Sequence, residues 1–149
     1  MEVPNTTILN KKIISLKGEI SRYGMNQNGL LYAVIYEHIT DKLIDSRLIG
    51  ISMEAGILWE HKGQLSFPIE LRIDPNSGKA YISQNNTISY VNQLGVTEKE
   101  ITLEVEEHQE IGSFVILPNG FIISLQSKGK PNTAVIRTDF NGNIIWKER

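Results

Sequence analysis

The chain has 149 residues, of which 40% are hydrophobic and 21% are charged, a composition typical of one ordinary globular domain. Its 15 Lys and Arg residues are outnumbered by 17 Asp and Glu residues, so the sequence supplies no concentrated positive field, and we expect no nucleic-acid partner. The absence of cysteine excludes disulfides, thiolate metal sites and thiol nucleophiles.

The first seven residues contain neither the basic nor the apolar segment of a secretory signal, and no later run is long enough to cross a bilayer. We therefore expect no membrane insertion, and a cytoplasmic location for the chain as written. An extracytoplasmic location stays open if the sequence is the mature piece of an exported protein.

The first 62 residues predict one extra strand, over 8–16, followed by a first unit of four strands over 17–62. The turn that joins the first two strands of this unit ends at Gly29, because Asn-Gly before an apolar run is a strong hairpin signal. The fourth strand carries Trp59. The four strands are expected at 20–23, at 30–36, at 46–52 and after Gly56.

Two more units of the same kind are expected over 65–106 and 110–149. In the second, the segment 97–106 begins like a helix, but its alternation of polar and apolar residues from Thr102 onward predicts an exposed strand. The strands of the second unit are expected at 69–73, 79–83, 87–92 and after Gly95. Those of the third are expected at 113–117, 121–125, 133–138 and after Gly142.

Turn glycines mark this repeat twice in every unit. One set precedes the second strand and is spaced by 49 and 42 residues, and the other precedes the fourth strand and is spaced by 39 and 47 residues. Two markers that keep the same order three times indicate a structural repeat. The first set is Gly29, Gly78 and Gly120, and the second set is Gly56, Gly95 and Gly142.

The second strands at 30–36 and 121–125 are apolar at nearly every consecutive position, so both of their faces must be buried. The fourth strands mix charged with apolar residues, as in 59–62 and 146–149. A sheet that is buried on both faces at its centre and charged at one edge is stacked between two similar sheets. Four-stranded antiparallel sheets with this period predict an all-β fold made of β-propeller blades.

The third unit carries the pattern Asp-x-Asn-Gly-x-x-x-Trp at Asp139, Gly142 and Trp146, and the first unit repeats Gly56 and Trp59 without the Asp. This pattern resembles the PQQ-like, or quinoprotein-type, β-propeller repeat, and the resemblance implies that the turn and the Trp dock one blade on the next. Each Trp is suited to fill the gap between adjacent sheets. The resemblance implies a quinone only for some members, whose adjacent Cys pair is absent here, so we expect no cofactor.

Three blades are too few for a closed ring, which typically has four to eight. We therefore expect either part of a longer propeller or one arc of a ring that other copies or another polypeptide complete. The strand over 8–16 suits a closing role, in which a leading strand becomes the fourth strand of the final blade.

No constellation of side chains predicts catalysis. The three histidines lie in different units without ligand spacing, so no metal site and no catalytic residues are expected. Arg22, Arg72 and Arg137 are candidates for contacting an anionic ligand in a central channel, but the sequence favours ordinary surface positions for them.

The sequence thus favours a non-enzymatic propeller module that acts as a binding scaffold and presents loops for protein recognition, with a protein partner or self-association. The alternative is an arc of a PQQ-like enzyme or of a carbohydrate-binding propeller, with a site in the central channel. Carbohydrate therefore stays open as a ligand.

Overall fold

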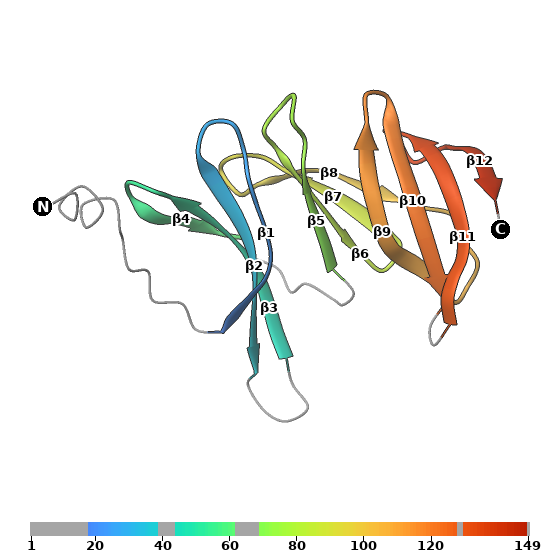
Figure 1. The fold of residues 1–149 in the computed structure, drawn as a ribbon, viewed down its shortest axis with the longest axis horizontal. Helices are drawn as coiled ribbons and strands as arrows, with labels where there is room; N and C mark the ends of the chain where they lie inside the picture. The colour runs from blue at the N-terminus through green and yellow to red at the C-terminus, as the bar shows by residue number, and fades with distance from the viewer. Residues whose placement is uncertain (1–17, 39–43, 62–68, 128–129, 149) are drawn as a thin grey trace, which may run out of the picture.

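The structure, a computed structural model, describes residues 18–38, 44–61, 69–127 and 130–148 (Figure 1). These residues form three four-stranded antiparallel sheets and no helix. The first sheet contains β1 (Glu19–Met25), β2 (Leu30–His38), β3 (Ile44–Ser52) and β4 (Gly56–Glu60). The second contains β5 (Ile69–Ile73), β6 (Ala80–Gln84), β7 (Thr87–Val91) and β8 (Thr97–Thr102). The third contains β9 (Gln109–Leu117), β10 (Gly120–Ser127), β11 (Lys130–Asp139) and β12 (Ile144–Glu148).

Each sheet is a simple meander in which every strand pairs with the next strand in sequence. The expected all-β architecture of three four-stranded antiparallel sheets is therefore confirmed. The described residues do not close these sheets into a ring. The extra strand expected over 8–16 lies outside the described residues. Among the described residues, a helix with the length and apolar character that membrane crossing requires does not occur.

The expectation of a strand that runs to residue 106 is wrong, because β8 ends at Thr102. From this point the chain leaves the sheet and crosses to β9. The backbone N–H of Leu103 donates to the carbonyl of Asn86, and the Asn86 side-chain amide donates to the carbonyl of Leu103. The Leu103 side chain is buried between the second and third sheets. The alternation in the sequence therefore reflects an anchored connection rather than strand pairing.

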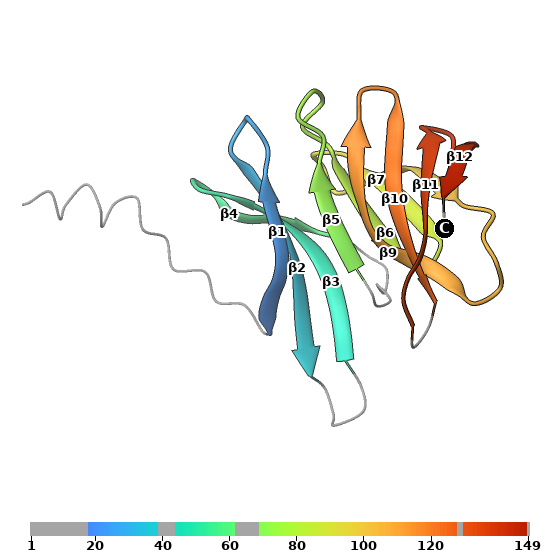
Figure 2. The same ribbon diagram turned by 45° about the vertical axis from the view of Figure 1, so that its right-hand side comes forward.

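The sheets stand side by side with their first strands adjacent, so that β1 contacts β5 and β5 contacts β9. Figure 2 shows these three strands running in the same direction along one edge of the assembly. The fourth strands lie at the other end of each sheet. This order places equivalent turns of all three sheets on the same side.

The core is divided between the gaps that separate the sheets. Between the first and second sheets, Tyr32, Val34 and Leu48 pack against residues of β5, β6 and β7. Between the second and third sheets, β10 contributes three buried side chains, Phe121, Ile123 and Leu125. The other face of the first sheet is also buried. Its residues form a separate cluster, Ala33, Ile35, Ile49 and Ile51, with Leu31 at its margin.

Candidate functional site on the turn rim

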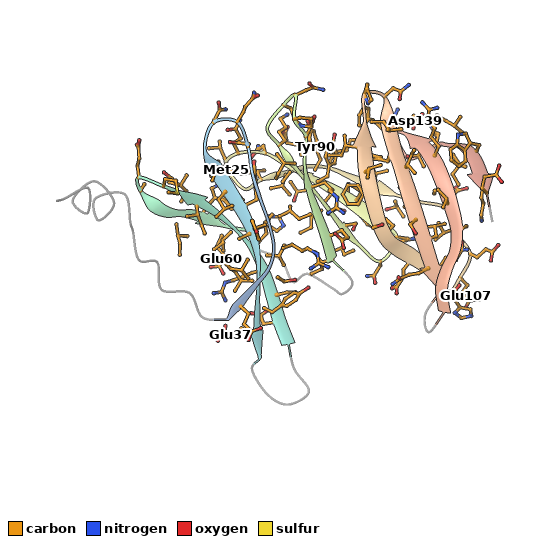
Figure 3. The ribbon with its side chains drawn as sticks, in the orientation of Figure 1. Met25, Glu37, Glu60, Tyr90, Glu107 and Asp139 are labelled. Atoms are coloured by element: carbon orange, nitrogen blue, oxygen red, sulfur yellow. The ribbon has the colours of Figure 1, made fainter. Side chains whose placement is uncertain are left out.

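The six short turns that join strands one to two and three to four lie together on one side of the molecule, the upper side in Figure 1. We call this side the turn rim. It comprises the turns at 26–29, 53–55, 74–79, 92–96, 118–119 and 140–143. In Figure 3, Tyr90 and Asp139 lie near the turn rim, whereas Glu107 lies at the opposite side.

We call the turn that joins the third and fourth strands of a sheet its third turn. In each sheet this turn is held by one side-chain oxygen. Asp139 Oδ1 accepts hydrogen bonds from the backbone N–H groups of Asn141 and Asn143, both at 2.9 Å. Asn92 Oδ1 does the same in the second sheet, and Ser52 Oγ plays this part in the first. The Asp of the sequence pattern is thus one of three residue types that form the same side-chain turn.

The Asp139 carboxylate is stabilised in its ionised form. The Asn143 side chain donates to it at 2.9 Å, and together with the backbone N–H groups of the turn it lowers the pKa of Asp139 below its ordinary value of 3.8. A lowered pKa means that the stabilising contribution is present above the ordinary value and is lost as the pH falls through the folded value.

We expect Asp139→Asn to keep the turn, because Asn92 holds the equivalent turn with an amide oxygen. The melting temperature of the wild type should therefore fall more steeply than that of Asp139→Asn when the pH is lowered below about 4, the ordinary pKa range of Asp. Thermal unfolding between pH 3 and pH 7 measures this difference. The reciprocal change, Asn92→Asp, should add acid sensitivity, and superimposable profiles for all three proteins would contradict the assignment.

Trp59 docks the first sheet on the third turn of the second sheet. Its indole Nε1 donates to the carbonyl of Gln93 at 2.8 Å. The ring lies between two glycines, because a Cβ built on either Gly50 or Gly95 would run into it. Gly95 has a φ of 81°, so the turn both needs a glycine conformation and leaves room for the indole. The ring of Tyr32 lies 5.7 Å from that of Trp59.

The second sheet docks on the third in the same manner but with different residues. Lys99 is at the strand position that corresponds to Trp59, since it pairs with Tyr90 as Trp59 pairs with Gly50. Its Nζ donates to Asn141 Oδ1 at 2.6 Å. Two residues further on, Ile101 approaches Gly142 so closely that a Cβ there would lie 2.6 Å from its methyl group. A cation and an aliphatic side chain thus replace one aromatic ring.

A second link between the first two sheets depends on Asn26, a buried residue that the sequence reading did not single out. Its side-chain amide donates to the carbonyl of Gly78 at 3.0 Å, and its Oδ1 accepts from the backbone N–H of Leu30. The hydroxyl of Tyr32 also donates to the Gly78 carbonyl, and burial raises the pKa of this phenol to about 12. The sequence signal that could have identified Asn26 is a polar residue just before the Asn-Gly turn.

The turn rim is hollowed between the second and third sheets by a pocket of about 340 Å³. Three aromatic rings line it, of which Tyr81 and Tyr90 are stacked with their centroids 4.5 Å apart, and Phe140 lies nearly parallel to Tyr81. Burial raises the pKa of the Tyr81 phenol, which keeps its hydroxyl neutral. The remaining lining is Asp74, Pro75, Asn76, Ile116, Leu117 and Pro118.

A pocket of about 450 Å³ lies on the opposite side, where the chain passes from the second to the third sheet. Its lining includes Asn85, Asn86 and the acidic segment 106–110. Within the described ranges, His, Asp and Glu do not gather in any group of three or more that could hold a metal ion. His61 lies at the rim instead, where its ring Nδ1–H donates to the carbonyl of Gly95 at 3.1 Å.

The structure brings together two of the three candidate arginines. Arg22 on β1 and Arg72 on β5 both bind the carboxylate of Glu70, at 3.2 Å and 2.9 Å. The Arg72 guanidinium also lies 5.9 Å from the centre of the Phe114 ring on β9. Arg137 lies apart on β11 and donates to Asn119 Oδ1. Glu70 is the residue that sequence reasoning missed, because its role depends on the adjacency of β1 and β5.

The six repeat glycines and Asp139 lie at turns or directly beside them, whereas Trp59 and Trp146 lie on the fourth strands, at the edges of their sheets. The five glycines Gly29, Gly56, Gly78, Gly95 and Gly142 have φ values between 72° and 88°, and Gly120 has a φ of 159°. Trp146 is on β12, where it pairs with Arg137, and 38% of its surface is exposed.

The chain matches no protein-family model, and no curated protein matches its sequence. The PQQ-like resemblance therefore stays a prediction.

Proposed function

We propose that this chain is an arc of a β-propeller, with one blade for each sheet, and that it serves as a non-enzymatic module for protein recognition at its turn rim. The observation that carries this proposal is the repeated docking of a fourth strand on the third turn of the next sheet, with the first strands side by side. Radially stacked four-stranded sheets are the propeller architecture. Further blades would complete the ring.

The composition of the rim supports binding of a protein. The pocket between the second and third sheets combines two Tyr, one Phe and two Pro with the carboxylate of Asp74 and the amide of Asn76. Aromatic anchors beside a few polar groups are typical of protein interfaces, where they contribute most of the binding energy. The rigid sheets hold these rim residues in place, as a scaffold with variable loops requires.

Asn76→Arg tests the proposal because Asn76 is an exposed residue of the rim pocket. The matched control is His108→Arg, which adds the same charge at an exposed position of the opposite pocket. A partner captured by the wild type from cells that make this protein should bind His108→Arg equally and Asn76→Arg about tenfold more weakly, which is a loss of about 1.4 kcal/mol. A partner that binds Asn76→Arg normally and loses His108→Arg would contradict binding at the rim.

A further inference from the structure

Each sheet carries one row of four residues that crosses its strands at the same level, and in the first two sheets this row faces the next sheet. We call it the forward row. In the first sheet the row is Gly24, Tyr32, Gly50 and Trp59. In the second it is Arg72, Tyr81, Tyr90 and Lys99. In the third, the register gives Val115, Ile122, Arg137 and Trp146.

The first two forward rows are packed against the sheet that follows. Trp59 and Lys99 reach the third turn of the next sheet, and Gly24 lies against Ile73. Tyr81 contacts the ring of Phe121 edge-on, with centroids 5.1 Å apart. The forward row is therefore one of the elements that join the first sheet to the second and the second sheet to the third.

The third forward row has a Trp at the same position as the first, and the described residues place no sheet in front of it. Val115 is 49% exposed and Trp146 is 38% exposed, and Val135 on the same face is 39% exposed. Among the described residues, the Nε of Arg137 is buried and has no hydrogen-bond partner. A buried donor without an acceptor is costly. Within the described residues this face therefore lacks apolar cover for its Val and Trp side chains and a hydrogen-bond acceptor for Arg137.

We propose that the forward face of the third sheet binds a fourth four-stranded antiparallel sheet, and that Trp146 contacts the third turn of that sheet. Arg137 takes the place of Gly50 in the third sheet, so the indole of Trp146 must lie differently over its own sheet from that of Trp59. This inference rests on the proposed function and names the partner of one surface. The docking turn must offer a glycine beneath the indole and a free backbone carbonyl to accept its N–H. The partner sheet must also present alternating apolar residues and an acceptor for Arg137 Nε.

A second copy of the described residues does not meet these requirements. The face that receives a forward row is occupied in the second sheet by the first, and in the third sheet by the second. The corresponding face of the first sheet has the required apolar side chains, but Ala33, Ile35 and Ile49 are at most 1% exposed. The described residues thus leave no receiving face free, and the partner is a sheet from outside them.

The chain itself supplies a defined probe, because its second sheet is known to receive Trp59. We would append a copy of residues 62–108 directly after Glu148, so that the copied sheet follows Trp146 at the same separation at which residue 62 follows Trp59. In the unextended chain, acrylamide should quench Trp146 readily and Trp59 poorly. In the extended chain both tryptophans should be protected and the emission should shift to the blue.

Two variants of the extended chain serve as controls. Trp146→Ala should remove the protected component that the extension adds, and Gly95→Val in the copied segment should leave Trp146 open to the quencher. An extended chain in which Trp146 stays fully quenchable overturns the proposal, because its receiving face is one that already binds an indole. A dimer of the unextended chain with Trp146 protected would also overturn it, in favour of a second copy. Neither readout depends on Asn76, so failure of rim binding is distinguished from failure of this docking.

Discussion

Replacing Trp59 with Ala is expected to lower the free energy of unfolding by about 3–5 kcal/mol, the range for removing a large aromatic side chain from a packed site. The indole fills the space between Gly50 and Gly95, and neither glycine has a side chain that can move into the gap. The substitution also leaves the Gln93 carbonyl without its hydrogen-bond donor. Urea unfolding followed by circular dichroism measures the loss.

The chain provides a matched control at Trp146, which has the same residue type at the same level of the third sheet. Because no described sheet covers Trp146, we expect Trp146→Ala to change the stability by about 0.5 kcal/mol or less, as at an ordinary surface position. Similar losses for the two variants would show that the contribution of Trp59 to the free energy of unfolding does not come from docking on the second sheet.

The fold could be predicted from the sequence because its signals are local. Gly29, Gly78 and Gly142 mark turns whose backbone conformation favours glycine, and the apolar runs between them can be satisfied only by sheets that are covered on both sides. Such features depend on a few neighbouring residues. They therefore identified the three meanders without any knowledge of tertiary contacts.

The contacts between sheets could not be predicted in the same way. Lys99 and Ile101 perform the docking role of a Trp, and this equivalence is visible only in the strand register. Asn26 and Glu70 connect residues that are about 50 positions apart in sequence, and their partners are set by the adjacency of β1 and β5. Pattern matching finds a repeated residue type, whereas these sites repeat a geometry with different residues.

The docking contacts between the sheets also bear on the proposed function. The rim turns at 92–96 and 140–143 are held by the sheet that docks on each of them, so the proposed binding surface has a rigid base. The pocket at Tyr81, Tyr90 and Phe140 lies between two sheets, so it exists only when the second and third sheets are docked. The proposed recognition at the rim would therefore be coupled to the stability of the junction below it, and variants at the junction should alter both.

Gly95→Ala is expected to destabilise the protein by about 2–5 kcal/mol, which combines two effects. The φ of 81° is unfavourable for an L-residue by about 1–2 kcal/mol. The new Cβ would also lie 2.5 Å from the ring of Trp59, and such overpacking typically costs about 1–3 kcal/mol. Gly29→Ala isolates the first effect, because its φ is 84° and nothing lies within 4 Å of its Cβ position. The loss at Gly29 should therefore be about 1–2 kcal/mol.

A double-mutant cycle then assigns the difference between these two variants to the indole. In a Trp59→Ala background the Cβ at residue 95 no longer meets the ring, so Gly95→Ala should cost no more than Gly29→Ala. Urea midpoints with an unchanged m-value would provide all four stabilities. If the penalty at Gly95 stays the same after the indole is removed, the turn is strained for another reason, and the docking of one sheet on the next does not depend on the close approach of Trp59 to this glycine.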